Sequence, residues 1–192
     1  MIVLASASAA RRRMLEGAGI AFAVDAAAID EDAAKQATAD QAAIADILAE
    51  RKALHVSARH PGALVIGADQ TLDCGGAGFD KPVDRAGARA QLLALRGRTH
   101  RLVSAVAVVQ DGRTLWRHRD AASLTMRDFS DGFLESYLDA VGDAALTSVG
   151  AYQLEGRGVQ LFERVAGDHF TILGMPLLPL LAHLRACGAV PS

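Results

Sequence analysis

The chain has 192 residues, of which 51% are hydrophobic and 22% are charged, and its formal net charge is −2. This length argues against several independent domains and fits one large globular domain or two small lobes that share a core. The near-neutral charge argues against a protein that coats duplex nucleic acid, because such proteins carry a strong basic excess.

Nothing in the sequence indicates export or membrane insertion. The first apolar run is only MIVLA, and the arginines follow it instead of preceding it as in a signal peptide. The longest apolar stretch, ILGMPLLPLLAHL, is interrupted by two prolines and is too short to cross a bilayer. Cys74 and Cys187 form no CxxC pair, and free thiols are favoured over a disulfide. We therefore expect a cytoplasmic protein.

Strands and helices are predicted to alternate along the chain, from apolar runs and helical spacing. In chain order, the predicted elements are a strand over 1–6, a helix over 9–19, a strand over 21–24, a polar loop with some helical turn over 25–40, a helix over 40–60, a strand over 63–69, a glycine-rich turn over 74–82, a helix over 84–97, two strands over 99–126 joined at 111–112, a helix over 130–142, a strand over 158–167 and a helix over 176–188. This order indicates an α/β or α+β sheet protein with helices on its faces.

The segment LASASAARRRML places hydroxyl and guanidinium groups directly after the first predicted strand. A helix N-terminus presents unpaired N–H groups and a partial positive charge. With Ser6, Ser8 and the arginines over 11–13 beside it, this N-terminus would form a phosphate site. The alternative is that the serines cap the helix and the arginines are solvated. No Walker loop is present in the chain.

Two groups of carboxylates are candidates for metal binding or catalysis. Asp69 ends the predicted strand LVIGAD, where an acid is either a cap or a group that holds a divalent metal or activates water. The run Asp30, Glu31 and Asp32 would suit magnesium, which often needs only one or two protein carboxylates. A solvated loop is the alternative for this run.

Two lysines are candidates for phosphate binding in a chain that mostly uses arginine for positive charge. A lysine presents a compact ammonium, which suits a phosphate. Lys52 lies in the helix over 40–60, where a surface ion pair is the alternative. Lys81 follows the glycine-rich turn and is placed to reach the same anion. The six histidines are dispersed, and neither HExxH nor GxSxG is present.

Eight segments resemble, in order and at similar spacing, the motifs of one protein family. They are LASASAARRRML, AIDED, LAERKA, GADQ, DKP, RGRTH, GAYQLEG and GDHFTILGMPL. Each motif alone is weakly specific, but the series spans nearly the whole chain. On these motifs the sequence resembles the Maf-like nucleoside triphosphate pyrophosphatases, a family named for inhibition of septum formation.

The resemblance implies a single α/β (α+β mixed sheet) domain over residues 1–192. The family fold is elongated and similar to that of ITPases, with a central mixed sheet flanked by helices and two lobes around a cleft. The implied reaction is hydrolysis of a nucleoside triphosphate between its α and β phosphates, giving a monophosphate and pyrophosphate, with Mg²⁺ or Mn²⁺ as cofactor. The implied partners are the nucleotide and a second copy in a homodimer, with neither nucleic acid nor a membrane. A non-catalytic nucleotide-binding regulator of cell division is the alternative.

The resemblance also implies roles for particular residues. They are Asp69 as the general base that activates water, Ser8, Arg11, Lys52 and Lys81 as phosphate-binding residues, and Glu31 with Asp69 as metal ligands.

The base specificity implied by the resemblance depends on three positions. Gln70 and Glu155 match the subfamily that acts on 7-methyl-GTP in the house-cleaning of non-standard nucleotides. A glutamate suits guanine because its oxygens accept hydrogen bonds from the ring N1–H and the exocyclic amine. Ala10 departs from both subfamilies, which have arginine or tryptophan there, and it offers no aromatic face to a cationic purine. A dTTP/UTP pyrophosphatase is therefore the alternative.

Overall fold

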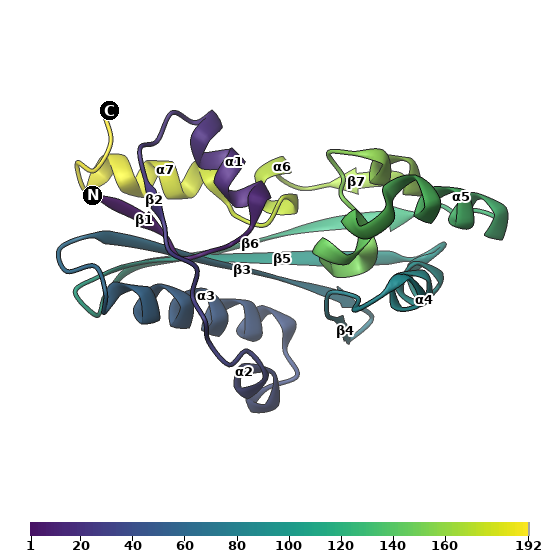
Figure 1. Ribbon diagram of the computed structural model, residues 1–192, viewed down its shortest axis with the longest axis horizontal. Coiled ribbons are helices and arrows are strands. Elements are labelled where there is room, and N and C mark those ends of the chain that lie inside the picture. The colour runs from purple at the N-terminus through teal and green to yellow at the C-terminus, as the bar shows by residue number, and fades with distance from the viewer. Residues whose placement is uncertain (192) are drawn as a thin grey trace. The chain divides into compact units, whose positions relative to one another are not determined.

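The computed structural model describes residues 1–191 and contains a seven-stranded sheet with flanking helices (Figure 1). The strands are β1 (Ile2–Leu4), β2 (Ala23–Val24), β3 (Leu64–Cys74), β4 (Ala77–Phe79), β5 (Thr99–Gln110), β6 (Arg113–Met126) and β7 (Phe162–Ala166). The helices are α1 (Ala9–Gly17), α2 (Asp32–Ala37), α3 (Gln41–Ser57), α4 (Arg85–Leu95), α5 (Asp131–Val141), α6 (His169–Ile172) and α7 (Leu177–Ala186), with 3₁₀ segments η1 (Gly142–Thr147), η2 (Val149–Ala151) and η3 (Arg157–Leu161).

The sheet is mixed. Its strand order is β2-β1-β3-β5-β6-β7, and β4 pairs with β3 outside this path. β1 pairs in parallel with β2 and β3, whereas β6 pairs antiparallel with β7. This arrangement confirms the predicted mixed α/β class with a central sheet.

Strand β3 is longer than the sequence predicts. The polar residues from Asp69 onward suggest an end to the strand, but β3 continues to Cys74. Its last residues pair antiparallel with β4, Leu72 opposite Phe79 and Cys74 opposite Ala77. The prediction that Asp69 ends its strand is therefore wrong, because pairing with a neighbouring strand outweighs local composition.

Other boundaries also differ from the predictions. The predicted strand over 158–167 is extended only within β7, whereas the helical turn expected in the polar segment over 25–40 is present as the short helix α2. The short helix α6 was not predicted. By contrast, the hairpin is confirmed, since Asp111 and Gly112 have φ values of 48° and 73°, as a tight two-residue turn requires.

Contacts within the chain divide it into two compact units. Unit 1 comprises Met1–Gln70, Val103–Ala121 and Asp168–Ser192, and unit 2 comprises Thr71–Leu102 and Ala122–Gly167. Strands β3, β5 and β6 contribute residues to both units. The single domain expected over residues 1–192 remains a prediction.

In unit 1, helices cover both faces of the strands (Figure 1). Successive side chains of a strand point to opposite faces. Ile2, Leu4 and Ile66 therefore pack against α1 and α7, whereas Val3 and Val65 pack against α3. This two-sided burial explains why β1 and the first half of β3 are continuous apolar runs.

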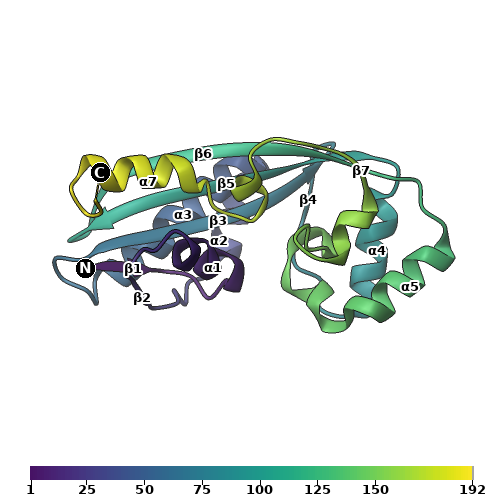
Figure 2. The same ribbon diagram turned by 90° about the horizontal axis from the view of Figure 1, so that it is seen from above.

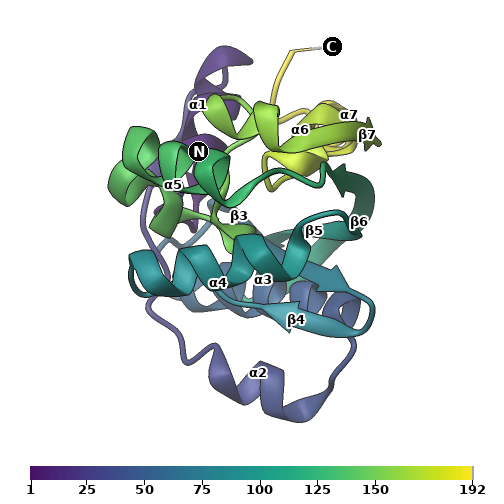
Figure 3. The same cartoon turned by 90° about the vertical axis from the view of Figure 1, so that its right-hand side faces the viewer.

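In unit 2, α4 and α5 lie side by side, and η1 and η2 pack on them (Figures 2 and 3). Both helices bury leucines spaced three or four residues apart, as an amphipathic helix does. These leucines are Leu92 and Leu95 in α4 and Leu134 and Leu138 in α5. Ser130 caps α5, since its side chain accepts a hydrogen bond from the Phe133 N–H.

Two further expectations bear on the environment of the protein. Among the helices over residues 1–191, none is both long and apolar enough to cross a membrane. Cys74 and Cys187 are free thiols in the structure, as predicted.

Candidate active site

The acid Asp69 lies in the middle of β3 and contacts a buried lysine. Lys52 of α3 donates a hydrogen bond from Nζ to Oδ1 of Asp69 at 2.6 Å. The same Nζ lies 2.7 Å from Oε1 of Glu31, the residue before α2. The Lys52 and Asp69 side chains are 12% and 10% exposed. The surface ion pair considered for Lys52 is therefore wrong, because this lysine bridges two carboxylates at a site largely removed from water.

A glycine allows this contact to form. Gly67 lies two residues before Asp69 in β3, where α3 crosses the strand closely. A Cβ at Gly67 would lie 2.1 Å from the Ala49 carbonyl oxygen and 2.7 Å from the Ala53 nitrogen. Any larger residue would push α3 away from the sheet. Gly67 therefore sets the distance at which Lys52 of α3 meets Asp69.

Arg11 is held in place from two sides. Its Nε donates to the Gly174 carbonyl oxygen at 2.8 Å, and its Nη1 donates to Ser6 Oγ at 3.2 Å. Ser8 is the N-cap of α1, since its Oγ accepts from the Arg11 N–H at 3.4 Å. Arg11 is buried, whereas Arg12 beside it is exposed. The serine cap is thus confirmed, and the solvated alternative for Arg11 is wrong.

The charges of the site influence one another. Burial raises the pKa of Asp69, and the cations Lys52 and Arg11 oppose that rise. Burial lowers the pKa of Arg11, while the charges of Asp69 and Glu31 raise it. An arginine nevertheless stays protonated in a protein. The cluster therefore contains two cations and two carboxylates, so its formal charge is balanced in the ionised state.

The donor set at this site fits a divalent cation. Glu31 and Asp69 converge on one ammonium, so both carboxylates reach a common cation position. Their oxygen atoms are the ligands that Mg²⁺ prefers, and Mg²⁺ usually takes one or two carboxylates with water and phosphate. Among residues 1–191, no group of three or more His, Cys, Asp or Glu side chains forms a metal site. Glu31 and Asp69 therefore suit a hydrated ion shared with a substrate better than a closed metal site.

Gln70 and Ala10 also lie in unit 1. The Gln70 side-chain nitrogen lies 3.1 Å and 2.9 Å from the carbonyl oxygens of Thr171 and Ile172, and 3.0 Å from Ser104 Oγ. This amide nitrogen is therefore occupied by contacts to α6 and β5. Ala10 is the second residue of α1 and is partly buried.

Lys81 and Glu155 lie in unit 2 instead. Lys81 is exposed between β4 and α4. Glu155 is exposed in a turn between η2 and η3. Both residues therefore belong to unit 2. The expectation that Lys81 reaches the anion near Arg11 remains a prediction.

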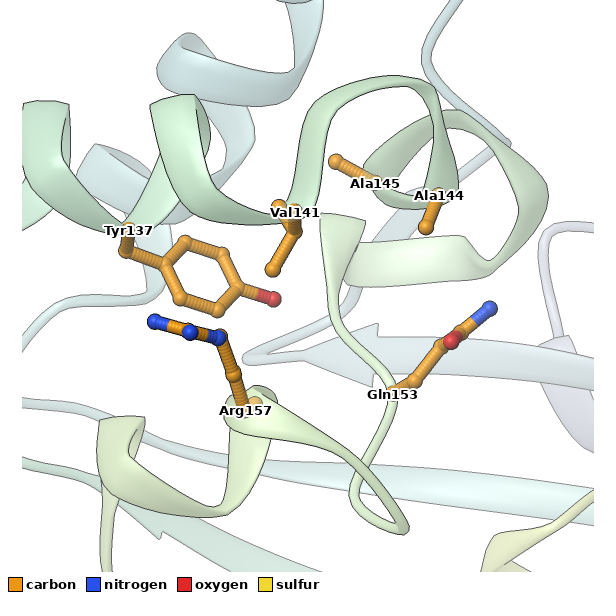
Figure 4. A pocket seen from close by; sticks show the side chains of 7 residues that line it. Tyr137, Val141, Ala144, Ala145, Gln153 and Arg157 are labelled. Atoms are coloured by element: carbon orange, nitrogen blue, oxygen red, sulfur yellow. The ribbon is translucent and has the colours of Figure 1, made fainter.

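A small pocket in unit 2 lies next to the turn that carries Glu155. Residues of α5, η1, η3 and this turn line it: Tyr137, Val141, Ala144, Ala145, Gln153, Arg157 and Gly158. Figure 4 shows the ring of Tyr137 and the side chain of Gln153 on opposite sides of the pocket. The pocket contains none of the acidic or basic residues clustered around Asp69.

Sequence reasoning missed two residues that hold this site together. Gly67 precedes the acid in the GADQ motif, and Gly174 supplies the carbonyl that orients Arg11. Gly174 has a φ of 105°, and a Cβ there would lie 3.5 Å from Arg11 Nε. The glycines in both motifs were visible in the sequence, but their role depends on what approaches them in space.

The chain is similar in sequence to known proteins. Residues 1–187 match the family described as "Maf-like protein". The chain is 65% identical over 190 residues to a "Nucleoside triphosphate pyrophosphatase" of Paramagnetospirillum magneticum, covering 97% of this chain and 98% of that protein. It is 53% identical over 188 residues to a "7-methyl-GTP pyrophosphatase" of Brucella abortus, covering 96% and 94%.

Similarity to a solved structure is lower. A HAM1 protein from Coxiella burnetii matches at a TM-score of 0.46 and 15% identity, covering 67% of this chain and 73% of that chain. The family match extends over nearly the whole described chain, and the two relatives are each more than half identical to it. The chain therefore belongs to the family of Maf-like proteins.

Proposed function

We propose that the protein is a hydrolase of acid anhydrides that cleaves a nucleoside triphosphate between its α and β phosphates. The products are a nucleoside monophosphate and pyrophosphate. One observation carries the proposal: the buried carboxylate of Asp69 contacts the ammonium of Lys52, which also contacts the exposed Glu31, and it interacts electrostatically with the buried Arg11. Relatives more than half identical to this chain are named pyrophosphatases, which supports the same activity.

Asp69 acts as the general base in this proposal. A carboxylate within hydrogen-bond reach of a water can take its proton as the oxygen attacks phosphorus. Burial raises the pKa of Asp69, which makes its carboxylate a stronger base, while the charges of Lys52 and Arg11 oppose that rise and favour the ionised form. The proton therefore passes to an oxygen of Asp69 when the water attacks.

The cations bind and orient the phosphates. Arg11 presents a guanidinium whose direction is set by the Gly174 carbonyl and Ser6, so little side-chain entropy is lost on binding. Lys52 has three N–H donors, of which two contact Asp69 and Glu31, and one remains for a phosphate oxygen. Ser8 and Lys81 complete the proposed phosphate-binding set.

A divalent ion such as Mg²⁺ or Mn²⁺ would be held by Glu31 and Asp69. It would supply positive charge to the bridging and leaving oxygens of the triphosphate. The need for it follows from the charge balance of the site, because two cations facing two carboxylates leave no excess for a polyanion. We propose a cytoplasmic location, where such nucleotides and reduced thiols occur together.

We propose that the preferred substrate is 7-methyl-GTP. Glu155 provides the carboxylate that accepts from the guanine edge, and Gln70 supports the site through its contacts to α6. The name of the Brucella abortus relative favours this choice. The second candidate, a dTTP/UTP pyrophosphatase, is favoured by Ala10, which gives a methylated purine no aromatic face.

Measuring pyrophosphate release tests both the proposed reaction and the proposed preference for 7-methyl-GTP. The purified protein is incubated with Mg²⁺ or Mn²⁺ and with 7-methyl-GTP, GTP, dTTP, UTP, CTP or 5-methyl-UTP. We expect pyrophosphate and monophosphate in equal amounts, with the highest kcat/KM for 7-methyl-GTP. A preference for dTTP or UTP would overturn the base assignment alone. Binding without release from any nucleotide would overturn the enzymatic function and favour the regulator.

A further inference from the structure

A short backbone segment of unit 2, from Ser148 to Gln153, is strained. Gly150 has a φ of 77°, and the next residue, Ala151, has a φ of 60°. A left-handed conformation is ordinary for glycine but unfavourable for alanine. A strained conformation of this kind persists only where the surrounding structure enforces it.

Side chains from three other elements hold this segment. Tyr137 of α5 donates its hydroxyl to the Ala151 carbonyl oxygen at 3.2 Å. Gln91 of α4 accepts from the Gly150 N–H at 3.1 Å. The Tyr152 hydroxyl shares a hydrogen bond of 2.7 Å with Nε2 of His100, which lies in β5. Ala151, Tyr152 and His100 are buried, so these bonds do not compete with water.

The space around Gly150 is also closed. A Cβ there would lie 2.7 Å from a ring carbon of Tyr152 and 2.8 Å from a methyl carbon of Leu72. The Ser148 Oγ donates back to the Tyr152 carbonyl oxygen at 2.5 Å. The path of the backbone is therefore determined on both sides of the strained residue.

The segment from Ser148 to Gln153 leads directly into the turn that carries Glu155. The Gly156 N–H donates to the Gln153 carbonyl oxygen at 3.2 Å, which places Leu154 and Glu155 at the two central positions of a β-turn. The Gln153 side chain donates to Thr147 Oγ1 at 2.8 Å. The first residue of the turn is thus held by a side-chain hydrogen bond, and Glu155, which is exposed, occupies a central position of the turn.

The far end of the turn is equally constrained. A Cβ at Gly158 would lie 2.4 Å from the Gln153 carbonyl oxygen. The chain after the turn therefore passes close against the backbone where the turn begins, and only a glycine fits there. Both ends of the Glu155 turn are fixed by contacts within unit 2.

We propose that Tyr137 is a positioning residue for base recognition, which acts by holding the left-handed backbone at Ala151, and with it the Glu155 turn, in one conformation. This inference rests on the proposed function, because it assigns to Glu155 the contact with the base. A carboxylate that reads two N–H groups of a base must be placed accurately, since a misplaced acceptor leaves polar groups unpaired. The ligand group recognised is a base edge that offers adjacent N–H donors.

The test compares two nucleotides that share ribose and triphosphate but differ in base, 7-methyl-GTP and UTP. The variants are Tyr137→Phe, Ala151→Gly and the double variant, and kcat and KM are measured for both nucleotides with saturating Mg²⁺. Ser136→Ala is the matched control, because Ser136 is the neighbouring hydroxyl on α5 and bonds within that helix, to the Gly132 carbonyl.

We expect Tyr137→Phe to move the ratio of the two kcat/KM values about tenfold toward 1. The change appears in KM for the better nucleotide, while kcat for the poorer one stays within about twofold. Ala151→Gly keeps the wild-type ratio, because glycine accepts the left-handed conformation without strain. For the same reason the double variant recovers part of the ratio lost in Tyr137→Phe, and Ser136→Ala matches the wild type.

Three results would overturn the proposal. An unchanged ratio in Tyr137→Phe, or an equal loss for both nucleotides, would mean that Tyr137 supports folding only. A double variant no better than Tyr137→Phe would mean that strain at Ala151 is not involved. If the wild-type protein releases pyrophosphate from no nucleotide, the proposed function fails and this inference fails with it.

Discussion

The two units hold their candidate functional residues in different ways. In unit 1, opposite charges neutralise one another, because Lys52 contacts both Asp69 and Glu31. Arg11 is oriented by hydrogen bonds to Ser6 and to the Gly174 carbonyl oxygen. In unit 2, neutral hydroxyl, amide and imidazole groups hold a strained backbone, and the charged Glu155 is exposed at a turn.

This difference matches the two physical tasks that the proposed function requires. Moving a proton and binding a polyanion need charges in a site of low polarity, where electrostatic interactions are strong. Recognising a base needs hydrogen-bonding groups at fixed positions, which a rigid neutral framework provides without adding competing charges. Substitutions in the Asp69 cluster of unit 1 should therefore change turnover, whereas those around the Glu155 turn of unit 2 should change selectivity or stability.

The largest effect is expected at Asp69. Asp69→Asn replaces the carboxylate with an amide that cannot accept the proton of water, so kcat should fall by about 10³-fold or more. Nucleotide binding, measured by calorimetry, should change by less than about threefold. Asp73→Asn, at the other acid of β3, is the control and should keep wild-type turnover. Full activity in Asp69→Asn would remove the catalytic role assigned to unit 1.

The next largest effect is expected at Gly67. Gly67→Ala places a methyl group against the α3 backbone, so α3 must shift away from β3 and take Lys52 with it. We expect a loss of about 3 kcal/mol in the free energy of unfolding, measured with urea, and a fall in kcat of about 100-fold. Gly17→Ala is the control, because a Cβ at Gly17 meets nothing within 4 Å. Equal effects of the two substitutions would contradict the close approach.

A pH effect is expected from unit 2. Burial lowers the pKa of His100 from 6.5 to about 4. Below pH 6.5 the unfolded chain binds a proton that the folded chain does not accept until about pH 4. The free energy of unfolding therefore falls as the pH is lowered through this window, by up to about 3 kcal/mol, and His100 contributes no pH dependence above it.

Urea unfolding at pH values between 7.5 and 4 measures this dependence. His100→Asn keeps a polar group beside Tyr152 but does not titrate, so its stability should vary less with pH than that of the wild type. The two proteins should have parallel curves if His100 is instead free to bind a proton in the fold. Such parallel curves would mean that His100 is not kept neutral in the folded protein.

The smallest effect is expected at Arg12, the neighbour of Arg11. Arg12 forms an exposed ion pair with Glu16 one turn along α1, at 3.2 Å. Such pairs contribute roughly 0.3–0.5 kcal/mol, so Arg12→Ala should lower stability by no more than that and leave turnover within about twofold. Arg11→Ala should instead raise KM for the nucleotide about 100-fold. Similar kinetics in the two variants would mean that burial does not distinguish these arginines.

Much of the fold was predictable from the sequence because it depends on local signals. Helical spacing located α3, α4, α5 and α7, and the Asp111–Gly112 pair located the hairpin. Asp40 and Ser130 are residue types that favour N-caps, and in the structure the side-chain oxygen of each accepts a hydrogen bond from an N–H group of the first turn. The length of β3 was not predictable, because its last residues are extended only through pairing with β4.

For the candidate site, the sequence by itself determined which residue types are available and in what order. It singled out Asp69, Lys52, Glu31 and Arg11 through motifs, but it allowed Lys52 a surface position and Arg11 full solvation. Only the tertiary structure brought these residues together, because their contacts join segments from 17 to 163 residues apart in the chain. Such contacts depend on how closely helix and strand approach, which at this site is set by the missing side chain of Gly67.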